Sequence, residues 1–364
     1  MFVVGLMSGT SLDGLDIAYC EFQEFESLSF RLLAAETYPY PAAWVERLST
    51  LEHASAYEYA LAHVELGRYF GACVNRFRQS HQGPIDLIAS HGHTIFHQPH
   101  LGLTTQIADG DAIAAATGLP VVFNFRTLDV ALGGQGAPLV PIGDRLLFGE
   151  YDACLNLGGF SNISYEESGV RKAFDVSPCN MALNDLAMRL GMSYDKDGIM
   201  ASQGRLNEDI LQKMNSLDYY HRPAPKSLGK EWYVEHFLPL IQSQNNSSFQ
   251  IIKSTNQQIN YNQSMLRTTV EHIAQQVSKA VSSQPIRTLL VTGGGAKNKF
   301  LIDRIASLSP QCRVSIPDPQ VVDYKEAIVF ALLGYLRVQG RNNCLQSVTG
   351  ASRDNCGGQL SGIF

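Results

Sequence analysis

The chain has 364 residues, a length that favours two domains because single hydrophobic cores stop growing at about 250–300 residues. Hydrophobic residues make up 45% of the sequence and charged residues 17%, a balance typical of a soluble globular protein. The formal net charge of −6 argues against nucleic acid or an acidic membrane surface as the main partner. We therefore expect neither a nucleic-acid-binding nor a membrane-associated protein.

The sequence pattern also predicts a cytoplasmic protein. Met1 is followed directly by a strand-like run without basic residues, which is unlike a signal peptide. No apolar run is long enough for a transmembrane helix. The seven cysteines are scattered and include no C-x-x-C pair, which is typical of reduced thiols and not of a disulfide framework or a zinc site.

The first element expected along the chain is a β-hairpin with an unusually polar turn. An apolar run at 3–7 predicts a buried strand, and residues 17–22 predict its returning partner. Between them, Gly9 and Gly14 permit tight or left-handed backbone, so that consecutive amides can point at one anion. The turn also carries hydroxyl donors and carboxylates: Ser8, Thr10, Ser11, Asp13 and Asp16. This combination indicates a metal–polyphosphate site such as Mg-ATP, with a ligand-free polar turn as the alternative.

The rest of the first half alternates between strands and helices, which predicts the α/β class. A third strand is expected at 29–38, so that the chain begins β-β-β. Helical spacing of apolar residues follows from 42 to about 80. Short strands are expected at 85–90, 106–109 and 121–123, with an Ala-rich helix at 111–117.

The second half repeats this plan. Residues 153–165 again predict strand, Gly/Ser/Asn turn and strand, and 170–174 predicts a third strand before a helix at 181–190. Two similar lobes follow from this duplication, each offering a glycine-bearing turn to a shared cleft. We place the N-terminal lobe at 1–131 together with 345–364, and the C-terminal lobe at 132–344.

A third glycine-rich segment lies between a strand and a helix in the C-terminal lobe. An amphipathic helix is expected at 264–283 and a strand at 287–291, which enters Gly293, Gly294 and Gly295 before a helix resumes to Leu308. This form lets flat or anionic groups approach the backbone, but it matches neither the dinucleotide fingerprint nor a P-loop. A further apolar helix is expected at 325–338, and the Ser/Asn/Gln-rich stretch 242–256 is expected to be a loop.

Four histidines at 91, 93, 97 and 100 invite comparison with a metal site. His91 and His93 would point to the same side of a strand. No cysteine or carboxylate follows at ligand spacing before Asp109, so that hydrogen bonding or packing is the favoured interpretation. No G-x-S-x-G elbow is present to support Ser-His-Asp hydrolysis.

Eight motifs, in order along the chain, together resemble one protein family. They are GLMSGTSLDG (5–14), SHGHT (90–94), GGQGAPLVP (133–141), LGGFSN (157–162), YDKDG (194–198), PKSLG (225–229), GGGA (293–296) and SVTGA (347–351). They cover essentially the whole chain and closely resemble the bacterial anhydro-N-acetylmuramic acid kinases of the actin/hexokinase/Hsp70 superfamily. The resemblance implies a two-lobed actin-like ATPase (ribonuclease H-like) fold, each lobe a mixed sheet starting β-β-β with flanking helices.

The resemblance also implies a reaction. Family members use Mg-ATP to phosphorylate O6 of 1,6-anhydro-N-acetylmuramic acid while water opens the anhydro ring at C1, which gives N-acetylmuramic acid 6-phosphate in peptidoglycan recycling. By position, the residues expected to bind the nucleotide are Gly9, Thr10, Ser11, Leu12, Asp13, Gly14, Asp16, Gly158, Gly159, Asn162, Gly293, Gly294 and Gly295. Asp13 is expected to hold Mg2+ through water. Those expected to face the sugar are Thr94, Arg126, Asn180 and Glu326.

Arg126 and the general base leave alternatives open. Arg126 suits bidentate pairing with the lactyl carboxylate of a muramic sugar, or an ion pair with Asp129. The family's base is an Asp four residues after the Asn of a G-P-x-N segment; here that position is Asn184, with Asp185 beside it. An amide can orient a water but cannot take its proton. Asp185, Asp175 or Glu326 would then supply the base, with Asp185, Asn184 and Glu326 as our catalytic assignment.

Two other outcomes follow from Asn184. The protein either acts slowly or on another sugar, or binds a muramic sugar and a nucleotide without turnover. An acetate- or glycerol-type kinase is disfavoured by the motif set. The family further implies a small amino sugar as the molecular partner and a homodimer as the assembly.

Overall fold

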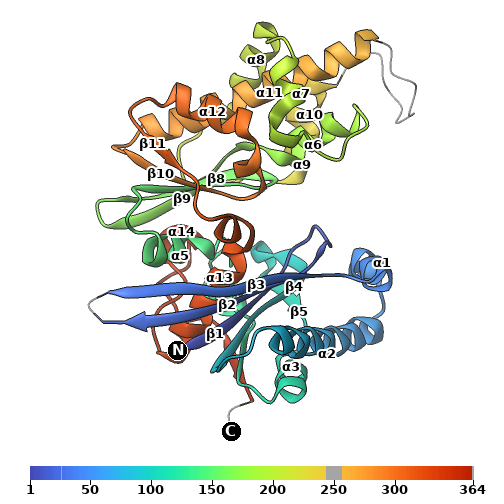
Figure 1. The fold of residues 1–364 in the computed structure, drawn as a ribbon, viewed down its shortest axis with the longest axis vertical. Coiled ribbons are helices and arrows are strands. Elements are labelled where there is room, and N and C mark those ends of the chain that lie inside the picture. Colours follow the sequence, from blue (N-terminus) through green and yellow to red (C-terminus); the bar gives the residue numbers. More distant parts are fainter. Residues whose placement is uncertain (26, 243–255, 363–364) are drawn as a thin grey trace. The chain divides into compact units, whose positions relative to one another are not determined.

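The computed structural model describes residues 1–25, 27–242 and 256–362, and it divides into two compact units (Figure 1). Unit 1 comprises Met1–Gly149 together with the segment that begins at Tyr324, and unit 2 comprises Glu150–Asp323. Most of the expected loop 242–256 lies outside the described residues.

The unit boundaries differ from the expected 131/132 and 344/345. The physical reason lies in helices α5 (Val140–Leu147) and α13 (Pro319–Val338), which sequence analysis placed in the C-terminal lobe. Lys325 of α13 forms an ion pair with Asp144 of α5 at 2.6 Å. A side chain at Gly143 of α5 would overlap Val329 of α13. The two helices therefore pack on each other within unit 1.

Unit 1 is built on a seven-stranded mixed sheet with the order β12-β6-β4-β1-β2-β3, to which β5 adds by pairing with β4. The strands are β1 (Phe2–Ser8), β2 (Gly14–Glu24), β3 (Leu28–Pro39), β4 (Leu87–Gln98), β5 (Leu103–Ile107), β6 (Val121–Phe123) and β12 (Gln359–Ser361). Strand β1 is antiparallel to β2 and parallel to β4. The central strand is almost continuously apolar and buried, as is typical of strands covered on both faces.

Helices cover both faces of the unit 1 sheet (Figure 1). Along β1, Val4 and Leu6 belong to the same core cluster as Leu66 of α2. Gly5 points the other way, and a Cβ there would overlap Ala327 O of α13. The remaining helices of this unit are α1 (Ala42–Thr50), α2 (Ala56–Ser80), α3 (Gly110–Thr117), α4 (Thr127–Ala131) and α14 (Gln346–Thr349), with short 3-10 turns η1 (Leu51–His53) and η2 (Pro99–Leu101).

Unit 2 is built on a five-stranded sheet with the order β11-β10-β7-β8-β9. Its strands are β7 (Ala153–Leu157), β8 (Phe160–Glu167), β9 (Val170–Pro178), β10 (Thr288–Thr292) and β11 (Arg313–Ser315). Strands β7, β8 and β9 form an antiparallel meander, and β10 adds parallel to β7. Both units thus begin β-β-β, which confirms the expected fold class.

The helices of unit 2 share one apolar core with this sheet. Buried residues of β7, α6, α11 and α12 belong to the same cluster, among them Leu155, Leu186, Ile273 and Leu301. The helices are α6 (Asn180–Met188), α7 (Ile199–Gln203), α8 (Glu208–Asn215), α9 (Lys230–Trp232), α10 (Leu238–Ile241), α11 (Asn256–Ser282) and α12 (Lys299–Leu308), with short turns η3 (Lys196–Gly198), η4 (Asp218–His221), η5 (Tyr233–Phe237) and η6 (Gly294–Lys297). No helix within the described ranges combines the length and the apolar character needed to cross a bilayer.

Candidate active site

The first glycine-bearing turn joins β1 to β2 in unit 1. Its backbone closes through a hydrogen bond from Leu12 N to Gly9 O at 3.3 Å. Among the described residues, the amides of Gly9, Thr10 and Ser11 donate no hydrogen bond. Three successive unbonded amides in a turn can bind an anion such as a phosphate. The Ser11 hydroxyl donates to the Asp13 carboxylate at 2.8 Å.

Of the tight or left-handed backbone that Gly9 and Gly14 were expected to permit, neither glycine adopts the left-handed form. Leu12 is the turn residue with positive φ, at 60°. Gly14 is required for another reason, because a Cβ at this position would overlap Tyr38 O of the neighbouring strand β3. Asp16 lies within β2 and accepts a hydrogen bond from Thr37 Oγ1 at 2.6 Å, so its carboxylate is engaged with the sheet.

Hydrogen bonds tie the start of this turn to strand β4. Ser8 Oγ lies 2.6 Å from Tyr40 OH and 2.8 Å from His93 Nδ1, and all three residues are buried. Burial lowers the pKa of His93 to about 4, so the ring is neutral near neutral pH. In the described part of the chain no group of three or more His, Cys, Asp or Glu residues is arranged to hold a metal ion. The contact that the structure gives the His93 ring is the hydrogen bond it shares with Ser8 Oγ.

Arg126 lies at the start of α4 and is held in place by two acceptors. Its Nε donates to His91 Nε2 at 3.0 Å, and its Nη1 donates to Gly136 O at 2.6 Å. His91 Nδ1 lies 3.0 Å from its neighbour's carbonyl, Gly92 O, so the ring is neutral with its proton on Nδ1. Burial and the Arg126 charge hold the pKa of His91 well below its usual range. Among the described residues, Nη2 of Arg126 has no hydrogen-bond partner.

The expected alternative partner of Arg126, Asp129, is engaged elsewhere. Asp129 is fully buried, and its carboxylate accepts hydrogen bonds from Gly136 N, Thr349 Oγ1 and Asn355 Nδ2 at 2.8–2.9 Å. No ion pair joins Asp129 to Arg126 within the described ranges. The guanidinium therefore keeps one edge available to a ligand.

The other residues expected to face the sugar in unit 1 are Thr94 and Glu326. Thr94 Oγ1 accepts a hydrogen bond from Gln106 Nε2 at 3.3 Å across the β4–β5 pair. Glu326 lies on α13 and is exposed. The surrounding protein still removes part of the hydration of its carboxyl group and raises the pKa, while Arg126 and Lys325 oppose that shift. Glu326 also opposes the lowering of the Arg126 pKa by burial, so the two charges interact.

The second glycine-bearing turn joins β7 to β8 in unit 2 and adjoins the start of α6. The carbonyls of Gly158 and Gly159 accept hydrogen bonds from the first amides of α6 and its cap, including Asn180 N to Gly158 O at 3.0 Å. The amides of Gly158 and Gly159 donate no hydrogen bond in the part of the chain that the structure describes. Asn162 follows in β8, opposite Asp175 of β9.

The triple glycine packs beside this second turn. Asn180 Nδ2 donates to Leu157 O at 2.9 Å, and a Cβ at Gly295 would come 2.6 Å from the Leu157 Cβ. Gly293 has φ of 82°, and a Cβ there would overlap Asn156. Three segments that sequence analysis singled out separately, at 158–162, 180 and 293–295, thus lie together in unit 2. The Asn180 amide lies beside the triple glycine, because a Cβ at Gly295 would come 3.2 Å from its Oδ1.

Asn184, which stands where the family has its general-base Asp, lies on helix α6 together with Asn180. Asn184 is four residues after Asn180 on α6, so both side chains lie on one face of the helix. Asp185 points elsewhere, because its Oδ2 accepts a hydrogen bond from Tyr233 OH at 2.5 Å. Asp175, the other candidate in this unit, accepts from Leu228 N at 2.8 Å, and burial raises its pKa.

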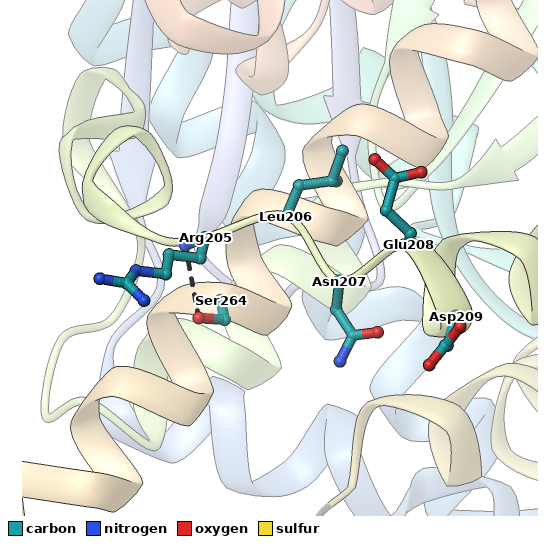
Figure 2. Close-up of a pocket in the computed structure, with 6 residues that line it drawn as sticks. All are labelled: Arg205, Leu206, Asn207, Glu208, Asp209 and Ser264. Carbon is teal, nitrogen blue, oxygen red and sulfur yellow. Dashed lines mark hydrogen bonds between the residues drawn. The ribbon is translucent and has the colours of Figure 1, made fainter.

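Several site contacts were not found from the sequence. Tyr40, Gln106 and Tyr233 hold Ser8, Thr94 and Asp185, yet none of them lies in a recognised motif. The motifs at 133–141 and 347–351 were recognised in the sequence. Nothing in their spacing indicated that both would contact Asp129. A pocket in unit 2 lined by Arg205, Leu206, Asn207, Glu208, Asp209 and Ser264 includes no expected site residue (Figure 2).

The two sheets and their glycine-bearing turns with unbonded amides define the class of α/β phosphate-binding proteins. The profile of the family Anhydro-N-acetylmuramic acid kinase matches residues 1–361, so the chain belongs to that family of phosphotransferases. The anhydro-N-acetylmuramic acid kinase of Pasteurella multocida is 35% identical over 96% of this chain and 94% of its own length. That of Vibrio cholerae is 36% identical over 96% and 95%.

Among solved structures, a ROK hexokinase from Thermus thermophilus covers 93% of this chain and 99% of its own, with 12% identity and a TM-score of 0.42. The resemblance found from the eight motifs is confirmed by the family match.

Proposed function

We propose that this protein is an ATP-dependent kinase that converts 1,6-anhydro-N-acetylmuramic acid and water to N-acetylmuramic acid 6-phosphate, in the recycling of peptidoglycan. In this reaction water adds to C1 and the C1–O6 bond breaks. O6 then takes the γ-phosphoryl group of ATP, and ADP is released. The observation that carries the proposal is the family match over residues 1–361. The unbonded amides of both glycine-bearing turns support it, because phosphoryl transfer depends mainly on positioning and electrostatics.

The residue roles in this proposal follow the donors and acceptors of each unit. In unit 1, the amides of residues 9–11 bind phosphate oxygens, and Asp13 holds Mg2+ through water. In unit 2, the amides of 158 and 159 bind phosphate, and the triple glycine lets the adenosine approach the backbone. In nucleotide sites, phosphates and water supply most of the ligands of Mg2+, so the protein needs to add only one carboxylate. The exposed side chain of Asp13 fits that requirement. When bound, the ion neutralises charge on the phosphates.

Arg126 binds the lactyl carboxylate of the sugar in this proposal. Its Nε and Nη1 are already bonded to His91 and Gly136, and this fixes the plane of the guanidinium. The Nη2 edge is then presented without a loss of side-chain entropy on binding. Thr94, which lies on strand β4, donates a hydrogen bond from its side-chain hydroxyl to a sugar hydroxyl.

The general base in this proposal is Glu326. A carboxyl group with a raised pKa is a stronger base near neutral pH, provided that it remains accessible to water, as Glu326 does. Asp185 is disfavoured because Tyr233 occupies its carboxylate. Asn184 orients the attacking water through its amide. The second candidate function, binding of sugar and nucleotide without turnover, is favoured by the Asn at this position.

A single-turnover assay with ATP and the anhydro sugar tests the proposal. We expect ADP and the 6-phosphate product in equal amounts, and a rate that falls by about 10²–10⁴ in Glu326→Gln, the range typical of a lost general base. Glu150→Gln, which alters an exposed carboxylate, is the control. Binding of both ligands by calorimetry without ADP formation would establish the non-catalytic alternative. Light scattering of the purified protein tests the homodimer that we propose as its assembly.

A further inference from the structure

A buried hydrogen-bond relay in unit 1 connects the segment after α13 to Arg126. Arg126 Nη1 donates to Gly136 O at 2.6 Å, and the amide of the same residue, Gly136 N, donates to Asp129 Oδ2 at 2.8 Å. Asp129 therefore fixes the peptide group before Gly136, and Arg126 is bonded to the carbonyl of the peptide group after it, so the two contacts meet at this one glycine.

The Asp129 carboxylate is completed by residues from a distant part of the sequence. Its Oδ1 accepts from Thr349 Oγ1 at 2.8 Å and from Asn355 Nδ2 at 2.9 Å. The backbone adds a further link, because Gln135 N donates to Thr349 O at 2.8 Å. The segment 349–355 thus supplies two of the three donors to this carboxylate.

The loop around Asp129 is shaped to the carboxylate itself. A Cβ at Gly134 would overlap Asp129 Oδ2, and Gly136 has φ of 65° with no room for a side chain beside Val130. A fully buried carboxylate costs free energy unless it is hydrogen-bonded, and the three donors to Asp129 meet that requirement. One of these bonds holds the amide of Gly136, the residue whose carbonyl accepts from Arg126.

We propose that Asp129 and Thr349 are positioning residues that aim Arg126 at the carboxylate of the substrate. The inference rests on the proposed function, in which Arg126 binds that carboxylate. Asp129 contacts no substrate in this scheme; it acts through Gly136 and Arg126. Its loss should therefore weaken recognition of the carboxylate and leave the chemical step in place.

Two variants test the relay. Asp129→Asn keeps the volume but replaces one acceptor oxygen with an NH2 donor, which then faces either Gly136 N or the donors of Thr349 and Asn355. Thr349→Val removes one donor. We expect Asp129→Asn to raise KM for the anhydro sugar about tenfold or more, as is typical of a lost hydrogen bond to a charged group, and Thr349→Val to raise it less. The kcat and the KM for ATP should stay near those of the parent. Thr117→Val, which removes a buried hydroxyl bonded to Ile113 O within α3, is the matched control.

A second sugar substrate, without the carboxylate, makes the test specific for recognition of the carboxylate. The same 1,6-anhydro sugar without its lactyl group cannot use Arg126, so Asp129→Asn should leave its KM unchanged. Equal increases in KM for both acceptors, or a loss in kcat alone, would overturn the relay, as would a Thr349→Val effect no larger than that of Thr117→Val. If the parent enzyme does not distinguish the two acceptors, or if Arg126→Ala leaves KM unchanged, the proposed role of Arg126 itself fails instead.

Discussion

His272 is a neutral imidazole in the core of unit 2, and its titration should make the stability of this unit depend on pH. The residue is fully buried in α11. Its Nδ1 lies 2.7 Å from Asn215 Oδ1 and its Nε2 lies 2.8 Å from Tyr220 OH, so a ring with its proton on Nδ1 satisfies both partners. Burial lowers the pKa of His272 to about 3.

The sign and the size of the effect follow from that pKa. A histidine in the unfolded chain titrates near pH 6.5, so the contribution of His272 to stability is fully present above that pH and is lost as the pH falls toward about 3. Each pKa unit corresponds to about 1.36 kcal/mol, so lowering the pH from 7 to 5 should remove about 2 kcal/mol from the free energy of unfolding of unit 2.

Urea unfolding followed by tryptophan fluorescence measures this loss. The chain has two tryptophans, and in a Trp44→Phe background the signal comes from Trp232, whose ring centroid lies 6.3 Å from that of Tyr220. His272→Gln should be less stable than the parent at pH 7, yet should lose about 2 kcal/mol less than the parent between pH 7 and pH 5.

The control for this experiment is His53→Gln, which alters an exposed side chain of unit 1. It should lose as much stability as the parent over the same range. If His272→Gln loses the same amount as the parent, the assignment of a buried neutral imidazole is refuted.

Two further predictions concern pairs of polar side chains, one in each unit. Asp185→Asn and Tyr233→Phe each remove the hydrogen bond between these two side chains, so each should lower the free energy of unfolding of unit 2 by about 1–2 kcal/mol. The single-turnover rate should change less than about tenfold, because this hydrogen bond is structural. A much larger loss of rate would make Asp185 the base. Lys325→Met should destabilise unit 1 by about 3–5 kcal/mol, because it breaks the buried ion pair that Lys325 forms with Asp144. Adding Asp144→Leu should recover most of that loss in urea unfolding, and additive losses would contradict the argument.

Much of the fold follows from local patterns in the sequence. The strands expected at 29–38, 121–123 and 170–174 correspond to β3, β6 and the first part of β9. Apolar periodicity and glycine-bearing turns depend on neighbouring residues alone, so the elements that they predict are found in the folded chain. The helices between 199 and 241 are short and follow no sustained period, which explains why they were not predicted.

The candidate site was predictable in its segments but not in its contacts. The turn at 8–16 was identified from composition, yet the positive φ falls at Leu12, and Gly14 is needed instead for its close approach to Tyr38 O. Asp185 was proposed as a base from its neighbour relation to Asn184, whereas Tyr233, far along the chain, occupies its carboxylate. Such pairings depend on how distant segments pack, and no local pattern encodes them.

Unit 1 is assembled from two separate stretches of the chain, and this has a consequence for synthesis on the ribosome. Its sheet includes β12, and its central strand β1 packs against α13, so neither is complete until residues 324–361 have been translated. Unit 2 is contiguous at 150–323 and emerges whole before them. Because domains generally fold as units during translation, unit 2 is expected to fold first, while the nascent N-terminal half waits for its missing strand and helix.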